Sequence, residues 1–258
     1  MTSSTHGSSA GLLAALWRNT PLLLIALAWE AASRGGLVAR AVLPALSEVG
    51  AAWFDLAVTG ELGLHALASS WRVAAGLGLA IVVGAALGLA MAWWQPARLV
   101  LSGLVELLYP LPKSALIPVT ALWLGFGDGS KILLIFLGCM LPVTLAAFNG
   151  ARGADEALIW SARNMGASRL RTLWDVAIPS ALPEILNGIR TSLALSFILL
   201  VSSELIAAQS GFGYLIGALG AAGTYDAMFA VVMTVAALGF IADRLYQLLM
   251  DRVLAWRT

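Results

Sequence analysis

"VAAGLGLAIVVGAALGLAMAWW", residues 73–94, is an apolar run that contains no charged side chain. A hydrocarbon core about 30 Å thick is crossed by about 20 helical residues, so this run predicts a transmembrane helix. Its small residues recur at every fourth position, because Gly76, Ala80, Gly84 and Gly88 share one helical face. Such a face allows the backbone of a second helix to approach closely. The run therefore predicts a span that packs inside a helical bundle.

The composition of the whole chain agrees with a membrane protein. Of its 258 residues, 60% are hydrophobic and 11% are charged, with a mean hydropathy of +0.89. A soluble domain carries about a quarter charged residues, so we expect an all-α, polytopic membrane protein. Six spans are predicted, at about 20–33, 73–94, 99–125, 132–148, 188–208 and 227–247. We interpret the first as an uncleaved span rather than a signal peptide.

Arginine and lysine residues are distributed unevenly between the two sides of these spans. An even number of spans places both termini on one side. Short cytoplasmic segments are enriched in Lys and Arg, which sets the orientation. The termini and the loops on their side hold Arg18, Arg98, Arg152, Arg163, Arg169, Arg171, Arg190, Arg244, Arg252 and Arg257. The opposite side holds only Arg34, Arg40, Arg72 and Lys131. Both termini are therefore predicted to be cytoplasmic. The near-neutral net charge of +1 gives no indication of a nucleic-acid partner, and we expect none.

The long loop at about 149–186 contains "ARNMGASRLRTLWDVAIPSALP", residues 162–183, which is basic and helix-forming. Gly166 is placed to end one short helix in a left-handed turn, and Ser168 is placed to cap the next. The predicted apolar faces comprise Leu158, Ala162 and Met165 on the first helix, and Leu170, Leu173, Trp174 and Ala177 on the second. We interpret the loop as a projection that docks into a soluble partner. The alternative is an anchor on lipid headgroups, which would need the arginines but neither the glycine bend nor the two prolines.

The pattern of Gly166, Val176, Ile178 and Pro179 resembles the EAA loop of binding-protein-dependent ABC importers, written E-A-A-x3-G-x9-I-x-L-P. In that family the loop forms a coupling helix that sits in a cleft of the ATPase subunit. The positions that match Glu-Ala-Ala are occupied by Trp160, Ser161 and Ala162, so the glutamate is missing. Glu156, one helical turn earlier, is the candidate replacement.

Four further segments resemble permeases of the nitrate, sulfonate and bicarbonate class. They are "SSWRVAAGLGLA" (69–80), "YPLPKSALIPVTALWLGFGDGSK" (109–131), "PSALPEILNGIR" (179–190) and "SGFGYLIGAL" (210–219). The resemblance implies a type I ABC importer permease fold, with residues 1–258 as a single transmembrane domain in a bacterial inner membrane. It implies three kinds of partner besides membrane lipid: two copies of an ABC ATPase, a second permease copy as a homodimer, and a periplasmic or lipid-anchored substrate-binding protein. The coupling residues that it indicates are Arg163, Met165, Gly166, Ala167, Ser168 and Arg169.

No catalytic or metal site is predicted in this chain. A phosphate-binding loop needs Gly-x4-Gly-Lys-Ser/Thr, and neither Lys113 after Pro112 nor Lys131 before Ile132 fits that pattern. We therefore expect that this permease is not an enzyme and that ATP and Mg²⁺ bind to the partner ATPase. The two histidines, His6 and His65, and the one cysteine lie far apart in the sequence, so we expect no bound metal.

Lys113, Glu204 and Trp123 are the candidates for the translocation path. A charge at the centre of a bilayer costs about 2.5–3.5 kcal/mol even on the lenient insertion scale, so Lys113 and Glu204 need a cavity or a partner. One interpretation places Lys113 on the path, where it attracts an anion. The other pairs it with Glu204 or Glu106 in a salt bridge. Trp123 is a candidate for stacking on the solute.

The function predicted from these observations is the import of a small solute, an anion such as a sulfonate, nitrate, bicarbonate or organic carboxylate. An autonomous secondary transporter is the alternative, although that class normally shows more spans and an inverted repeat. An intramembrane enzyme is a third hypothesis, for which no acid–base or metal constellation is visible.

Overall fold

The computed structural model describes residues 7–257, and for 7–19, 22 and 257 it describes the backbone alone. The described residues form helices joined by turns, with no β-strand among them, which confirms the all-α prediction. The α-helices are α1 (Gly7–Arg34), α2 (Leu46–Val58), α3 (Glu61–Trp93), α4 (Gln95–Leu108), α5 (Ile117–Leu124), α6 (Asp128–Arg152), α7 (Glu156–Asn164), α8 (Arg169–Thr172), α9 (Ile178–Ala207), α10 (Phe212–Ala221) and α11 (Tyr225–Val253). A 3-10 turn, Lys113–Leu116, precedes α5, and a π-helical turn, Leu173–Ala177, joins α8 to α9.

Four helical segments of the described part are long and apolar enough to cross a membrane. They are α3, α6, the continuous run Arg169–Ala207 that ends in α9, and α11. They contain the predicted spans at 132–148 and 227–247 and all but the last residue of those at 73–94 and 188–208, which confirms four of the six.

The span predicted at about 99–125 is broken in the structure, because the chain bends by 92° between α4 and the segment Lys113–Leu124. Pro110 and Pro112 lie at the bend, and each lacks the N–H that would continue the helix. This bent pair counts as a fifth span if both halves cross together. The first predicted span falls within α1, which is not one of these segments, so it stays a prediction.

The glycine-lined face of α3 lies directly against α6, as the spacing predicted. A Cβ atom added to Gly76 would come within 2.8 Å of Ile135, and one added to Gly84 would come within 2.8 Å of the Met140 carbonyl oxygen. Ala80, between them, is fully buried. Larger side chains at these positions would force the two helices apart, so the small residues set the distance between α3 and α6.

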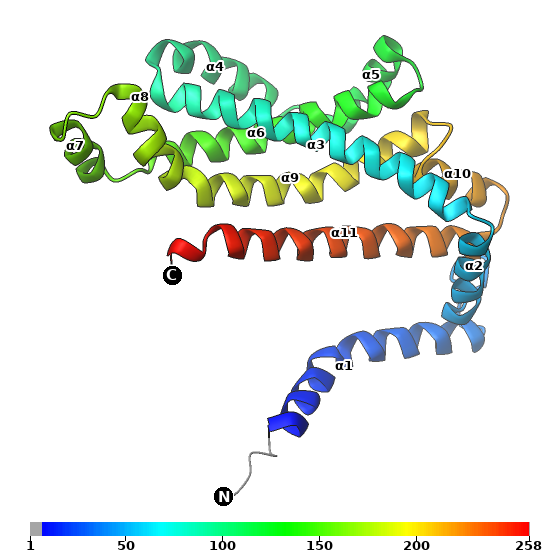
Figure 1. Cartoon of the computed structure of the whole chain (residues 1–258). Coiled ribbons are helices and arrows are strands. Elements are labelled where there is room, and N and C mark those ends of the chain that lie inside the picture. Colours follow the sequence, from blue (N-terminus) through cyan, green and yellow to red (C-terminus); the bar gives the residue numbers. More distant parts are fainter. Residues whose placement is uncertain (1–6, 258) are drawn as a thin grey trace, which may run out of the picture.

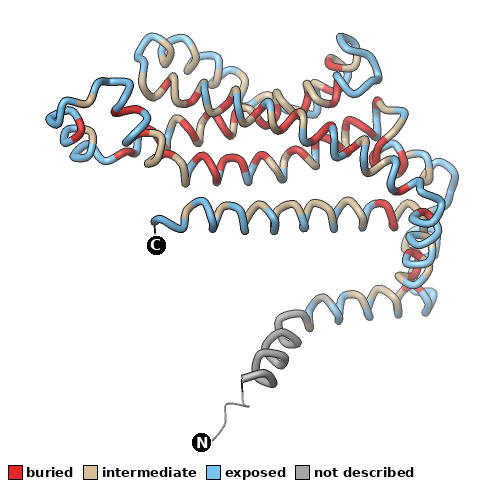
Figure 2. Tube along the Cα trace, in the orientation of Figure 1, coloured by how far each residue is buried: buried red, intermediate tan, exposed pale blue. Residues whose placement is uncertain are grey.

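The buried residues concentrate where α3, α6 and α9 pack together (Figures 1 and 2). α11 runs beside α9 and buries only Ala230 and Val231, so most of its surface remains uncovered. α1 extends away from the bundle and is connected to it through α2. The indole N–H of Trp29 donates to the Pro44 carbonyl oxygen at 2.8 Å, and its ring meets Phe229 of α11 edge-on at 5.8 Å.

The two ends of the bundle carry different features. α7 and α8 project from one end, and the C-terminus lies at that same end (Figure 1). The turn between α5 and α6, the start of α3 and the whole of α10 lie at the opposite end.

Candidate functional site

The bend between α7 and α8 is formed by a left-handed glycine. Gly166 has a φ of +84°, a conformation that side chains with a Cβ adopt at a cost. Its N–H donates to the Arg163 carbonyl oxygen at 2.9 Å, and the Ala167 N–H donates to the Ala162 carbonyl oxygen at 3.0 Å. This pair of bonds is the Schellman motif, in which the last carbonyls of a helix accept from the residues that leave it. The left-handed turn predicted at Gly166 is confirmed.

The second short helix begins as the sequence predicted. The Ser168 side chain accepts from the Arg171 N–H at 3.2 Å and so caps α8. α8 continues through the π-helical turn into α9 without a break, and Pro179 occupies the first turn of α9. A π-helical turn is a rare insertion that is frequently found at functional sites. α8 and α9 therefore belong to one continuous helical run, Arg169–Ala207, which is long enough to cross a membrane.

The exposed surface of this loop mixes arginine with large apolar side chains. Arg163, Arg169 and Arg171 are exposed, as expected. The predicted face of the second helix is partly wrong, because Leu173 and Ala177 are buried against the bundle while the other two members point outward. The large apolar side chains left exposed on the loop are Leu158, Trp160, Met165, Leu170 and Trp174. Such a patch on a short projecting segment indicates an interaction site.

Lys113 acts as a cap for the helix that precedes it. Its ammonium group donates to the carbonyl oxygens of Leu108 at 2.6 Å, Leu111 at 2.8 Å and Tyr109 at 3.2 Å. In a continuing helix the Leu108 carbonyl would pair with residue 112, which is a proline without an N–H. The cation also faces the negative end of the α4 dipole. Among the described residues it has no carboxylate partner, so the predicted pairing of Lys113 with Glu204 or Glu106 is wrong.

Lys113 and Trp123 nevertheless line the same cavity. Its volume is about 210 Å³, and its wall combines the bent segment with α6 through Leu137, Met140 and Leu141. Trp123 is largely exposed beside it. The structure thus brings together two of the three path candidates, and the role of both on a path stays a prediction.

Glu204, the third candidate, is buried at the opposite end of the bundle and pairs with Arg72. The Arg72 Nη1 atom lies 2.6 Å from Glu204 Oε1, and the side chains are 3% and 0% exposed. The Ser69 hydroxyl lies 2.9 Å from both carboxylate oxygens, and the Gly213 N–H donates to Oε2 at 3.0 Å. The carboxylate of Glu204 is thus engaged by partners within the protein, and a role of Glu204 on a path stays a prediction.

Sequence reasoning missed the other residues of this buried network. Arg72 also binds Asp128 at 2.7 Å, and it donates to the carbonyl oxygen of Ser210 at 2.7 Å. Lys131 is 1% exposed and donates to the Phe126 carbonyl oxygen at 2.7 Å and to that of Ala207, the last residue of α9. The distribution of Lys and Arg predicts that Arg72 and Lys131 lie in segments outside the membrane, whereas the structure buries both side chains. The available signal was Glu204 itself, because a charge inside an apolar span needs a partner.

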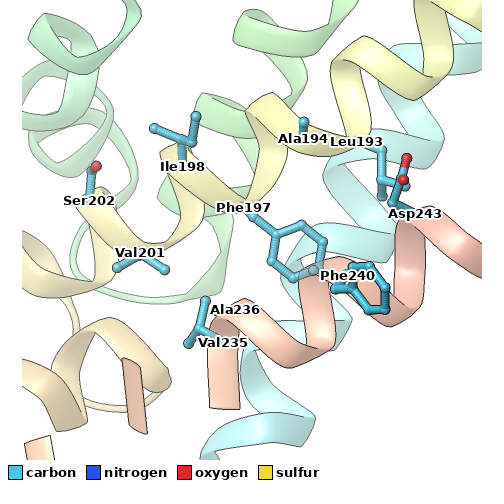
Figure 3. Close-up of a pocket in the computed structure, with 11 residues that line it drawn as sticks. Leu193, Ala194, Phe197, Ile198, Val201, Ser202, Val235, Ala236, Phe240 and Asp243 are labelled. Atoms are coloured by element: carbon cyan, nitrogen blue, oxygen red, sulfur yellow. The ribbon is translucent and has the colours of Figure 1, made fainter. Parts of the chain in front are cut away.

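An apolar groove of about 480 Å³ separates α9 from α11 (Figure 3). Phe197 points from α9 toward Phe240 on α11. Toward the α7 end, Arg190 donates twice to Asp243, at 2.7 and 3.1 Å, and so closes the groove. Among the described residues, no group of three or more His, Cys, Asp and Glu side chains is placed to hold a metal ion.

The fold defines the class: a multi-pass helical membrane protein with a short projecting loop that continues into one of the spans. Residues 76–255 match the family described as binding-protein-dependent transport system inner membrane component. The chain therefore belongs to this family, and it is the permease subunit of an ABC importer.

Relatives and solved structures agree with this assignment. The chain is 35% identical over 192 residues to the taurine transport system permease protein TauC of Escherichia coli. The aligned region covers 74% of this chain and 70% of that protein. It is 34% identical over 237 residues to the putative aliphatic sulfonates transport permease protein SsuC of Bacillus subtilis, with 92% and 86% covered. A structure of the MetNI methionine ABC transporter in an inward-facing conformation shares the fold, with a TM-score of 0.63 at 20% identity over 78% of this chain and 98% of that chain. The alternative of an autonomous secondary transporter is set aside.

Proposed function

We propose that the chain imports an organic sulfonate and that ATP hydrolysis by a separate ABC ATPase drives this import. The observation that supports a sulfonate is the similarity to permeases named for taurine and for aliphatic sulfonates, which extends over most of the chain. A substrate-binding protein delivers the solute at the end of the bundle that carries α10. ATP and Mg²⁺ bind to the ATPase, and this chain supplies the passage.

The docking site for the ATPase is the segment Arg163, Met165, Gly166, Ala167, Ser168 and Arg169. The exposed apolar side chains in and around this segment, together with its Schellman bend, support this assignment, because they present a shaped and partly apolar surface beyond the end of the bundle. Two ATPase subunits and a second copy of this chain complete the transporter. Both termini are proposed to be cytoplasmic, and the place of the C-terminus at the same end as the docking segment supports this for the C-terminus.

The path for the solute passes beside the cavity that Lys113 and Trp123 line. The ammonium group of Lys113 is occupied by carbonyl oxygens, so it offers an anion a positive field rather than free hydrogen-bond donors. Trp123 presents an exposed aromatic face beside it.

Uptake by the reconstituted transporter tests this function. The permease, its copurifying ATPase and its binding protein are placed in vesicles with ATP inside, and radiolabelled taurine or an alkylsulfonate is added outside. We expect accumulation that needs ATP and the binding protein and that unlabelled sulfonate suppresses but methionine does not. Accumulation of methionine or nitrate with no sulfonate uptake would show that the proposed solute class is wrong.

A further inference from the structure

Two arginine side chains flank the Gly166 bend and border one hollow. Arg163 belongs to the last turn of α7, and Arg169 is the first residue of α8. Together with Ala167 they line a concave region of about 370 Å³. Both side chains are exposed, so the hollow is open to a partner.

The acidic side chains of the same loop do not neutralise these two arginines. Asp155 caps its own helix by accepting from the Ala157 N–H at 2.8 Å. Asp175 pairs with Arg171 at 3.2 Å. Across the described part of the chain, neither Arg163 nor Arg169 forms an ion pair, and Arg169 donates only to the Trp93 carbonyl oxygen at 3.2 Å.

Two other arginines, on α4 and α6, pack against one aromatic ring. The guanidinium groups of Arg98 and Arg152 lie 5.6 and 5.5 Å from the centre of the Phe148 ring, where α4 begins and α6 ends. α7 projects beyond that level (Figure 1). The hollow therefore lies on a loop that projects past this end of the bundle, which favours a protein partner over lipid.

We propose that this hollow receives carboxylate side chains from the groove of the ATPase subunit, so that the docking contact is basic on the permease and acidic on the ATPase. Guanidinium groups pair with carboxylates through two parallel hydrogen bonds, which gives both direction and strength. The exposed Trp160 occupies the motif position of the missing glutamate, so an apolar contact replaces an acidic one there. This inference rests on the proposed function, because it requires that an ATPase docks at this loop.

The chain offers a direct cross-linking test. It contains only two lysines, of which Lys131 is buried at the opposite end and Lys113 lies at the α4–α5 bend. A carbodiimide joins a lysine amine to a carboxylate that touches it. In the complete complex, Arg163→Lys and, separately, Arg169→Lys should each form a link to an Asp or Glu of the ATPase, which peptide mass spectrometry identifies. The matched control is Arg152→Lys, which should form no such link.

The possible results distinguish a failure of the proposed function from a failure of the charge pairing alone. If the wild-type chain copurifies with no ATPase, the proposed function fails and this inference fails with it. If the complex is intact but neither variant forms a link to an ATPase carboxylate, the inference alone is overturned.

Charge reversal gives a second measurement. Arg163→Glu combined with Arg169→Glu should weaken the association with the ATPase on the order of 10- to 100-fold in detergent, and high salt should weaken the wild-type association in the same direction. Arg152→Glu should change it by less than twofold. A loss that occurs only in anionic lipid vesicles and not in detergent would show that the hollow binds headgroups, which would overturn the inference.

Discussion

At the scale of single residues, the buried Arg72–Glu204 pair is the ion pair whose loss should destabilise the fold most. Replacing one partner leaves the other charge buried without compensation, which costs about 3–5 kcal/mol. We expect Arg72→Met and Glu204→Gln each to lower the yield of folded protein and its melting temperature in detergent. The double replacement should recover part of this loss, but not all, because Arg72 also holds Asp128 and Ser210.

A matched control for this prediction is the exposed pair of Arg190 and Asp243, whose side chains are 43% and 36% exposed. Exposed ion pairs contribute about 0–1 kcal/mol, so Asp243→Asn should shift the melting temperature little. Equal losses at the two pairs would contradict the importance that burial gives to the first.

Lys113 is expected to matter as a helix cap before it matters to the solute. Lys113→Met removes the donor from three carbonyl oxygens and should lower stability by about 1–2 kcal/mol, whereas Lys113→Arg retains both charge and donors. Because the proposed path passes beside Lys113, the sulfonate concentration at half-maximal uptake should rise in the folded fraction of the methionine variant and should stay nearly unchanged in the arginine variant. An unchanged value in the folded methionine variant would leave the helix cap as the only role of Lys113.

These residues show where sequence reasoning reached its limit. The need for a partner at Glu204 followed from the cost of a buried charge, but Arg72 lies 132 positions away and no local pattern connects the two. One of the two interpretations of Lys113 pairs its charge with a carboxylate, whereas carbonyl oxygens of the proline-broken backbone beside it accept its hydrogen bonds in the structure. The Gly166 turn and the Ser168 cap were predictable because each depends only on neighbours within a few residues.

At the scale of elements, the angle between α7 and α8 depends on the left-handed glycine. A Cβ at Gly166 would have nothing within 4 Å, so the cost of a substitution is conformational rather than steric. Gly166→Leu should destabilise the bend by about 1–2 kcal/mol and lower the ATPase activity that the loaded binding protein stimulates. Gly166→Asn should retain most of that activity, because Asn tolerates this conformation. Normal stimulation in the leucine variant would argue against coupling through this bend.

The close packing of α3 against α6 can be tested by comparing two glycines of α3, one that faces α6 and one that does not. A Cβ at Gly88 would come within 2.7 Å of the Ala147 side chain, whereas one at Gly78 would have nothing within 4 Å. Gly88→Val should therefore separate the helices and lower the melting temperature by several degrees, while Gly78→Val should leave it nearly unchanged. The predicted stripe of Gly76, Ala80, Gly84 and Gly88 was recoverable from sequence because periodicity alone defines a helical face. The 92° bend was not, since prolines mark a break without setting its angle.

At the scale of the whole molecule, the arrangement predicts which end faces the cytoplasm. The docking loop and the C-terminus share one end, and the turn between α10 and α11 lies at the other. Cys139 is fully buried, so the wild-type chain provides an unreactive background for cysteine labelling. Each new cysteine then reports the side of the membrane on which it lies.

Ser168→Cys should react with a membrane-impermeant maleimide only from the cytoplasmic side, and Ala222→Cys, in the exposed turn after α10, only from outside. The first should also be protected when the ATPase is bound, because the docking segment is then covered, whereas the second should be unaffected. Labelling is measured in right-side-out and inverted vesicles, with and without the ATPase. The physical reason for the orientation is the bias of arginine toward the end that carries the loop, since short basic segments are retained in the cytoplasm. Labelling of Ser168→Cys from outside would show that the molecule has the opposite orientation in the membrane. The docking segment would then lie out of reach of any cytoplasmic ATPase.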